Sequence, residues 1–344
     1  MAHRLWPLNS KGTDVRSVDY SDGVITLIDQ TKLPQAEEML RIDNVDDLVA
    51  AIKRLAVRGA PAIGLAGAYG VALAARLHEP GTAAFEQAVT AIREARPTAV
   101  NLAYAVDRLK PLAVGGVAAL EAEAHTIRDE ELAASVAMGE TGADLVLELT
   151  GVAAPRVMTI CNTGGLAAVE RGTALAVIQT LHERQALTEA IPVETRPLLQ
   201  GGRLTTWELQ RMGAPFRLAV DSAGPFLLTQ DAADVVLIGA DRVAANGDTA
   251  NKIGSLSLAL GAARAGVPFI VVAPESTVDM STASGDDIEV EDRGADEVTS
   301  IRGVPVAPAG TAAINPAFDV TPVDLITALV TEQRVVRFGQ GDAL

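Results

Sequence analysis

The sequence has few of the residues that form disulfides and metal centres. Of its 344 residues only Cys161 is a cysteine and only four are histidines. One cysteine cannot form an intramolecular disulfide or a cysteine cage for a metal. Because the histidines are scattered without ligand spacing, a zinc site is not expected. We therefore expect neither a metal nor another cofactor.

Positive charge is also scarce. Lysine and arginine together number 28 against 44 acidic residues, which gives a net charge of −16. A field of this sign repels nucleic acid and anionic membranes, so neither is an expected partner. An acidic protein that binds an anionic metabolite must instead concentrate its few cations locally.

Long apolar runs are missing as well. Although 49% of the residues are apolar, no run approaches the ~18 uninterrupted residues of a membrane span. The first residues, MAHRLWPLNSKGTD, lack the apolar core of a secretory signal. These features predict a cytoplasmic protein, and the length favours two domains over one.

The first part of the chain predicts a small sheet followed by helices. Short apolar segments between residues 14 and 42, with a turn at Ser21-Asp22-Gly23, indicate an antiparallel sheet. Helical spacing begins after Asn44, a good N-cap, and should stop at Gly59. Residues 82–149 are helical in pattern.

Three features punctuate that helical region. Arg96-Pro97 breaks one helix and Thr98 should cap the next. Gly115-Gly116 marks a second break. Residues 117–149 fit either one long helix or a pair interrupted near Gly139 and Gly142.

Beyond residue 150 strand-like and helix-like segments alternate, which favours a parallel, doubly wound sheet. LAAVERGTALAVIQTLHER is mostly helical in pattern, FRLAVD strand-like, and TPVDLITALVTEQ a closing helix capped by Thr321. We predict an α/β chain. A smaller, mainly helical domain that carries the antiparallel sheet spans residues 1–150, and a Rossmann-like domain spans 151–344.

The stretch DVVLIGADRVAANGDTANKIGS contains the best candidate site. Its first residues read as a buried parallel strand. Asp241 follows the carboxyl end of that strand, where open α/β sheets bind ligands. An isolated aspartate also serves as a helix cap or an ion-pair partner. Asn251 and Lys252 lie where a new helix would offer N–H groups to an anion.

Two further strand ends carry polar or reactive groups. Cys161 ends RVMTIC before a glycine turn, and a helix start there would lower the pKa of its thiol; the alternative is a small buried apolar residue. Glu194 ends AIPVE, and Gln200 in the next loop suits sugar hydroxyls. Parallel strands bring such ends to one edge of a sheet, which predicts a shared site. Proton transfer there would use the carboxyl and the thiol, each tuned by burial.

AVRGAPAIGLAGAYG predicts another helix, with Pro61 at its first position. The glycines at three-residue intervals allow either close helix packing or a backbone approach to a ligand, and the spacing favours packing. Arg58 stands just ahead of this helix. A cation beside helix N–H groups suits phosphate.

Six motifs resemble those of the methylthioribose-1-phosphate isomerases, a methionine-salvage family related to regulatory subunits of the eukaryotic translation initiation exchange factor. In the family's order they are AVRGAPAIG, ARPTAVN, CNTGGLA, ETRPLLQGGRLTTWEL, GADRVAANGDTANKIGS and NPAFDVTP. They span nearly the whole chain. The resemblance implies a small N-terminal domain, a Rossmann-like C-terminal domain and a homodimer.

The resemblance also implies residue roles. It makes Asp241 the proton donor and Cys161 the group that stabilises or deprotonates the reacting centre. The substrate contacts it implies are Arg58, Gly59, Ala60, Arg96, Gln200, Asn251 and Lys252. Gly165 and Ala168 depart from the alanine and threonine expected in the turn after Cys161.

The implied reaction converts 5-methylthio-α-D-ribose 1-phosphate into 5-methylthio-D-ribulose 1-phosphate. Hydrogen moves between C2 and C1 as a proton or as a hydride, and the sequence favours neither. One alternative is a ribose-1,5-bisphosphate isomerase, which needs a second phosphate site. Another is a non-catalytic regulatory subunit, which has no need of a thiol and a carboxyl at neighbouring strand ends.

Overall fold

The computed structural model describes residues 16–97 and 99–344. These residues form two compact units. Unit 1 contains the described residues up to Ser135 together with Thr163–Gly172, and unit 2 contains Val136–Asn162 and Thr173–Leu344. Helix α5 (Gly116–Thr150) carries the chain from unit 1 into unit 2. It ends at the residue where the sequence pattern changes from helical to alternating.

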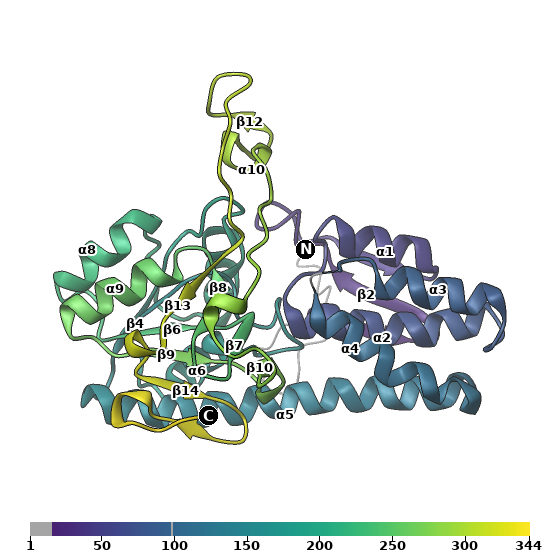
Figure 1. Ribbon diagram of the computed structural model, residues 1–344, viewed down its shortest axis with the longest axis horizontal. Coiled ribbons are helices and arrows are strands. Elements are labelled where there is room, and N and C mark those ends of the chain that lie inside the picture. The colour runs from purple at the N-terminus through teal and green to yellow at the C-terminus, as the bar shows by residue number, and fades with distance from the viewer. Residues whose placement is uncertain (1–15, 98) are drawn as a thin grey trace. The chain divides into compact units, whose positions relative to one another are not determined.

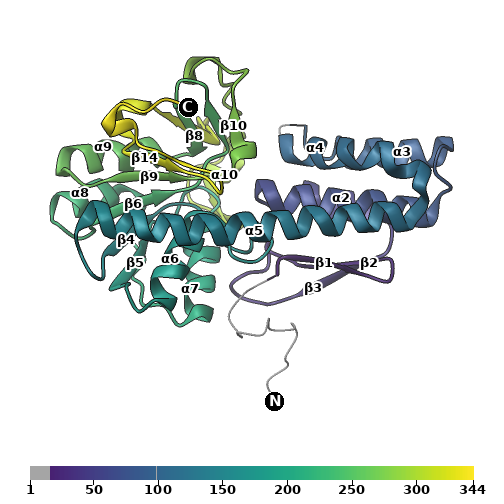
Figure 2. The same cartoon turned by 90° about the horizontal axis from the view of Figure 1, so that it is seen from below.

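Unit 1 contains the predicted antiparallel sheet, in the order β1-β2-β3 (Figure 2). Its strands are β1 (Val18–Ser21), β2 (Val24–Ile28) and β3 (Met39–Ile42). Two residues connect β1 to β2, and both have positive φ, 52° at Asp22 and 81° at Gly23. A type I′ hairpin turn requires this conformation, so the predicted turn is confirmed.

Helices make up the rest of unit 1. They are α1 (Val45–Lys53), α2 (Ala60–Leu77), α3 (Ala83–Arg93), α4 (Val100–Leu109) and the first part of α5. Asn44 caps α1 as predicted, because its Oδ1 accepts the Asp47 N–H at 2.9 Å. The helix ends before the predicted Gly59, since Leu55 takes a φ of 63°. The predicted cap Thr98 lies outside the described residues.

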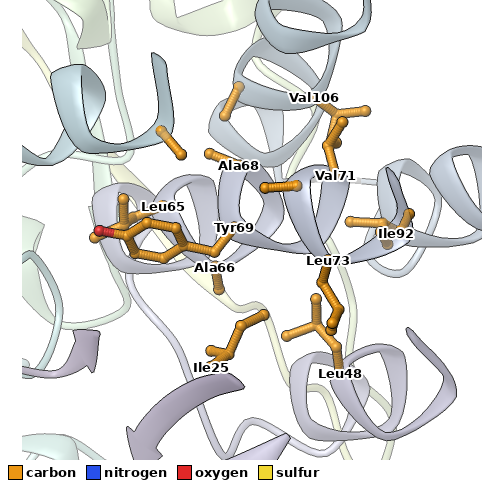
Figure 3. Packing of buried hydrophobic residues seen from close by; sticks show 14 of the residues in the cluster. Ile25, Leu48, Leu65, Ala66, Ala68, Tyr69, Val71, Leu73, Ile92 and Val106 are labelled. Atoms are coloured by element: carbon orange, nitrogen blue, oxygen red, sulfur yellow. The ribbon is translucent and has the colours of Figure 1, made fainter. Parts of the chain in front are cut away.

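Helix α2 forms the centre of unit 1 (Figure 3). Every residue from Ala62 to Ala75 is buried. By length and composition this helix could cross a membrane. The expectation that no apolar run approaches the length of a membrane span is therefore wrong. In this protein 78% of the helix is buried inside the fold. A Cβ at Gly67 would lie 2.5 Å from Leu102 Cδ1, and one at Gly70 2.5 Å from Leu48 Cδ2. These glycines permit close packing, as the spacing favoured.

Helix α5 is continuous over 35 residues. Gly139 and Gly142 do not interrupt it but face α6 (Ala174–Glu183). A Cβ at Gly139 would lie 2.7 Å from Thr180 Oγ1, and one at Gly142 would lie 2.5 Å from Val177 Cγ2. Of the two predicted alternatives, the single long helix is therefore correct.

Unit 2 is built on a six-stranded sheet with the order β15-β14-β9-β6-β4-β5. Its strands are β4 (Arg156–Thr159), β5 (Glu189–Pro192), β6 (Val235–Ile238), β9 (Phe269–Val272), β14 (Ala328–Val330) and β15 (Val335–Val336). All neighbours pair in parallel except β14 with β15. The chain runs outward from β4 to β5 and then returns to β6 on the other side of β4. The strand order therefore reverses between β4 and β6.

Helices cover both faces of this sheet (Figure 1). On one face Leu228 of α8 (Gly224–Thr229) and Leu258 of α9 (Ser255–Ala265) pack in one core with Met158 and Val236 of the strands. The second half of α5 and α6 lie across the other face. Strand β6 is buried at all four positions, as predicted.

Three predicted elements of unit 2 differ from the structure. The segment TPVDLITALVTEQ is not a helix, because it contains the end of β13 (Phe318–Thr321) and all of β14. A strand buried on both faces is an apolar run without a readable period, so it resembles a helix segment. FRLAVD makes only isolated bridges, from Phe216 to Ala190 of β5 and from Ala219 to Val193 just beyond β5. In LAAVERGTALAVIQTLHER the helix begins only at Ala174.

A second sheet, with the order β10-β7-β8-β13, was not predicted. Its other strands are β7 (Arg242–Ala244), β8 (Thr249–Lys252) and β10 (Val278–Asp279). The remaining elements of unit 2 are α7 (Thr206–Met212), α10 (Asp296–Thr299), β11 (Ser300–Ile301) and β12 (Val304–Pro305). Asn251 and Lys252 therefore belong to a strand, and the helix expected at these residues begins at Ser255.

Candidate functional site

The candidate site lies at the carboxyl ends of β5, β4 and β6. These strands are adjacent and parallel, with Thr159 of β4 paired to Pro192 on one side and to Leu237 on the other. Cys161, Glu194 and Asp241 follow the three strand ends. The prediction that these ends share one edge of the sheet is thus confirmed. Because the strand order reverses between β4 and β6, Cys161 and Asp241 flank the position where doubly wound sheets bind ligands.

Left-handed backbone conformations cluster at this edge. The φ angle is 65° at Cys161, 67° at Thr195 and 58° at Leu199. Each costs a non-glycine residue about 1–3 kcal/mol, and a β-branched residue such as threonine rarely adopts it. Asp221 stabilises the strained loop, since its carboxylate accepts the N–H groups of Thr195 at 2.7 Å and Arg196 at 2.6 Å. Strain maintained in this way is typical of functional sites.

Hydroxyl groups hold the backbone of Cys161 on both sides. Its N–H donates to Thr195 Oγ1 at 2.8 Å, and its carbonyl accepts from Thr205 Oγ1 at 2.6 Å. The side chain is 9% exposed. Thr205 ends η2 (Gly201–Thr205), a π-helical turn, which is a feature frequent at functional sites.

Two expectations about the reactive groups are wrong. Turns follow Cys161, and the next helix begins only at Ala174, so no helix N-terminus lies directly after the thiol. Asp241 is exposed, so burial does not dehydrate its carboxyl. Its N–H donates to the Ala250 carbonyl at 2.9 Å and joins this segment to β8.

Gln200 and Glu194 lie in buried or half-buried surroundings. Gln200 is 5% exposed, and its Oε1 accepts no hydrogen bond from any described residue. A buried acceptor without a partner costs about 1–3 kcal/mol, so this oxygen is suited to a ligand hydroxyl. Burial, with a contribution from the Asp221 carboxylate, raises the pKa of Glu194.

Asn251 and Lys252 form contacts within unit 2. Asn251 is 4% exposed and donates to Ser255 Oγ at 2.8 Å. Lys252 Nζ donates to the Ala317 carbonyl at 2.7 Å and lies 4.4 Å from the centre of the Phe318 ring. These contacts fix both side chains beside the start of α9.

The start of α9 is capped from another strand. The Asp319 carboxylate accepts the N–H groups of Gly254 at 2.7 Å and Leu256 at 3.1 Å. The expectation that these N–H groups are offered to a substrate anion is therefore wrong, because a carboxylate of the chain already occupies them. Burial raises the pKa of Asp319, and the two N–H donors oppose that rise.

Arg58, Gly59 and Ala60 lie at the start of α2 in unit 1. Gly59 is the N-cap, with a φ of 92°, and a Cβ there would overlap Ala167. The Ala62 N–H donates to the Ala167 carbonyl at 3.2 Å. An arginine beside the first turn of a helix suits phosphate. Arg96 follows α3 and is half-buried.

The turn after Cys161 belongs to unit 1 and packs on this helix start. The Leu166 carbonyl accepts a hydrogen bond from Gln30 Nε2 at 2.7 Å, and the Ala168 carbonyl accepts one from Ser17 Oγ at 2.5 Å. The hydrogen bond from the Ala62 N–H to the Ala167 carbonyl brings the motifs AVRGAPAIG and CNTGGLA, which are distant in sequence, into direct contact. Gly165 and Ala168, which depart from the family pattern, lie in this turn.

Thr195, Thr205 and Asp221 were not predicted as site residues. Threonine is rarely a general acid or base, Asp221 ends the segment FRLAVD, and the role of all three depends on contacts across the loop. Among residues 16–97 and 99–344, no group of three histidine, cysteine or acidic side chains is placed to hold a metal ion.

The sequence matches the Initiation factor 2 subunit family over residues 56–337. The chain belongs to this family. It is 48% identical to a methylthioribose-1-phosphate isomerase of Anaeromyxobacter sp. (strain K), over 94% of each chain. It is 51% identical to a probable bifunctional methylthioribose-1-phosphate isomerase/methylthioribulose-1-phosphate dehydratase of Nocardia farcinica, over 94% of this chain and 59% of that protein.

Two crystal structures have the same fold. The 5-methylthioribose 1-phosphate isomerase of Pyrococcus horikoshii OT3 is 38% identical, with a TM-score of 0.88 over 94% of this chain and 92% of that chain. The translation initiation factor eIF-2B, subunit delta, of A. fulgidus is also 38% identical, with a TM-score of 0.83 over 94% of this chain and 96% of that chain. This mixed α/β fold therefore occurs both in a protein named as an isomerase and in one named as a translation initiation factor subunit.

Proposed function

We propose that this chain is an aldose–ketose isomerase of methionine salvage, which converts 5-methylthio-α-D-ribose 1-phosphate into 5-methylthio-D-ribulose 1-phosphate. Relatives that carry only the isomerase name match along 94% of this chain and 92–94% of their own length. The bifunctional relative is covered over 59% of its length. We therefore propose the isomerase activity and not the dehydratase activity in that relative's name.

The proposed chemistry uses the two strand-end residues. Asp241 donates a proton to the ring oxygen, because an aldose phosphorylated at C1 cannot open its ring by simple hemiacetal exchange. In the open chain a hydrogen leaves C2 and arrives at C1 while the C2 hydroxyl becomes a carbonyl, and the proton that this hydroxyl loses balances the one that Asp241 donated. Cys161 stabilises or deprotonates the reacting centre. The transfer proceeds as a proton through an enolate or as a hydride, and no external oxidant or reductant is needed.

The proposed binding roles follow the contacts of each residue. Gln200 Oε1 accepts from a sugar hydroxyl, since it is buried and accepts from no described residue. Arg58, Gly59 and Ala60 bind the phosphate at the start of α2, with Arg96 as a second cation. Asn251 and Lys252 contribute polar contacts beside α9. Fixed hydrogen-bond donors of this kind strengthen stabilisation of the developing charge.

We also propose a Rossmann-like C-terminal domain at residues 151–344, a domain boundary near residue 150, and a cytoplasmic homodimer. The first is supported by the strand order. We count the segment that bridges β5 as a strand, leave out the antiparallel edge strand β15, and number the remaining six strands along the chain. Their order is then 3-2-1-4-5-6, that of the dinucleotide-binding fold. The dimer is supported by the family resemblance.

The observation that carries the proposal is the position of Cys161 and Asp241 just after the carboxyl ends of two adjacent parallel strands, where the strand order reverses. The test compares turnover of methylthioribose 1-phosphate with that of ribose 1,5-bisphosphate. Faster turnover of the bisphosphate would favour the alternative isomerase, and turnover of neither would favour a regulatory subunit. Asp241→Asn should fold and lose ~10²–10⁴ in kcat, the usual contribution of a positioned acid or base. An unchanged kcat would remove Asp241 from the mechanism.

A further inference from the structure

We propose that Thr195 and Thr205 are positioning residues for Cys161. Their hydroxyls hold the peptide groups on either side of Cys161 and thereby fix the place of its thiol at the sheet edge. The inference rests on the proposed function only in that Cys161 takes part in the reaction. It assigns a role to two residues whose hydroxyls bond to the backbone of Cys161.

The geometry of the two hydroxyls is complementary. Thr195 Oγ1 accepts the Cys161 N–H at 2.8 Å and donates its own proton to the Val193 carbonyl at 3.0 Å. Thr205 Oγ1 donates to the Cys161 carbonyl at 2.6 Å and lies 3.3 Å from Asn162 Nδ2, from which it accepts. Each hydroxyl proton is therefore committed to a carbonyl. Neither threonine has a proton left to transfer, so their role is to position and not to react.

Cys161 needs this support because regular structure no longer supplies it. Strand β4 ends at Thr159, so the sheet ladder offers no partners two residues later. Cys161 also has a φ of 65°, a conformation from which a non-glycine residue relaxes unless the surrounding structure prevents it. The two hydroxyl bonds oppose that relaxation. Losing one would let the backbone rotate and would move Cβ and Sγ together.

The supports are themselves held rigidly. Thr195 and Thr205 are 0% and 1% exposed. The N–H of Thr195 donates to Asp221, and Thr205 lies at the end of the π-helical turn η2. This arrangement joins the loops after β4 and β5 through Cys161. The thiol position is thus determined by side chains of one neighbouring loop and one neighbouring helix.

The test compares valine and serine at each position. Thr195→Val and Thr205→Val keep the branched shape but remove the hydroxyl, whereas Thr195→Ser and Thr205→Ser keep the hydroxyl. Thr321→Val is the control, because Thr321 is fully buried in unit 2 and its hydroxyl has no partner among the described residues. We would measure kcat and KM for methylthioribose 1-phosphate, thermal unfolding, and the rate at which iodoacetamide alkylates the thiol. Cys161 is the only cysteine, so the label reports one site.

Each valine variant at positions 195 and 205 should lose ~10–100-fold in kcat with KM changed less than ~3-fold, because a displacement of about 1 Å can cost 10²-fold in rate. The alkylation rate should rise at least ~5-fold as the thiol leaves its buried position. The serine variants and Thr321→Val should behave like the unaltered protein. Serine variants as impaired as the valine variants would overturn the inference, since shape and not the hydroxyl would then matter.

Two other outcomes also decide the question. If the valine variants keep both the alkylation rate and kcat of the unaltered protein, the hydroxyls do not position the thiol. If both valine variants fail to fold while both serine variants fold, the hydroxyls serve stability and the positioning role is rejected. If the unaltered protein turns over no sugar phosphate, the proposed function fails, but the alkylation series still tests the position of Cys161 by itself.

Discussion

The substitution Gly59→Ala tests how the start of α2 is built. Gly59 has a φ of 92° and a ψ of 139°, a combination open essentially to glycine alone. A Cβ there would lie 2.5 Å from Ala167 Cα and would overlap the Ala167 carbonyl oxygen. Ala167 cannot withdraw easily, because its carbonyl accepts the Ala62 N–H.

Two separate penalties make up the expected cost. The positive-φ, extended-ψ backbone costs an alanine about 1–3 kcal/mol. Overlap with a backbone that cannot relax costs about 1–3 kcal/mol more. The free energy of unfolding should therefore fall by about 2–6 kcal/mol, a large part of the ~5–15 kcal/mol that stabilises a typical protein.

Gly81→Ala is the matched control. Gly81 has a similar φ of 85°, but nothing lies within 4 Å of a Cβ built there. This variant should lose only the backbone term. Urea unfolding of both variants measures the difference, which we expect to be about 1–3 kcal/mol. If Gly59→Ala costs no more than Gly81→Ala, the close contact between the helix start and the turn after Cys161 is refuted.

Three further predictions follow from single side chains. Cys161→Ser should lower kcat far more than it raises KM, since a hydroxyl ionises less readily than a thiol; a change in KM alone in steady-state kinetics would make Cys161 only a pocket residue. Arg58→Ala should weaken binding of inorganic phosphate, measured by calorimetry, by about 1.5–3 kcal/mol. Arg58→Lys should keep part of the lost binding free energy, because lysine retains the charge but not the bidentate geometry. If Arg58→Ala binds phosphate as tightly as the unaltered protein, the phosphate site lies elsewhere. The hydrogen bond from Arg156 lowers the pKa of Asp234 in the folded protein. This ion pair therefore stabilises the fold fully at pH values above the unfolded-state pKa of about 4, and the stabilisation is lost as the pH falls through the lower folded-state pKa. Asp234→Asn should thus lower the free energy of unfolding at pH 7 by about 1 kcal/mol, with a smaller difference at pH 3; equal losses at both pH values would contradict this assignment.

Local patterns explain the features that were predicted correctly. The Asn44 cap, the Asp22-Gly23 turn and strand β6 each depend on a few consecutive residues. The shared edge of Cys161, Glu194 and Asp241 followed from one further rule, that parallel strands end on the same side. The glycines of α2 followed from spacing alone. Such features can be read from sequence because the interactions that specify them lie within a few residues.

Long-range contacts decided what the sequence analysis missed. Strand β14 is a strand because β9 lies beside it, although its apolar residues also suit a helix. Lys252 belongs to β8 because Phe318 pairs with it across the sheet, and Asp319 reaches the start of α9 from that same neighbouring strand. These partners are distant in sequence, so no local pattern announces them.

The amino-acid sequence by itself determined the α/β class, the edge of the sheet where chemistry is expected and the candidates Cys161 and Asp241. Only the tertiary structure decided that Cys161 takes a left-handed conformation held by Thr195 and Thr205, that Asp241 is exposed, and that the turn after Cys161 packs in unit 1. The physical reason is that residue type and spacing specify local hydrogen bonds and burial patterns. Strained backbone angles and side-chain partners are set by the packing of segments that meet only after folding.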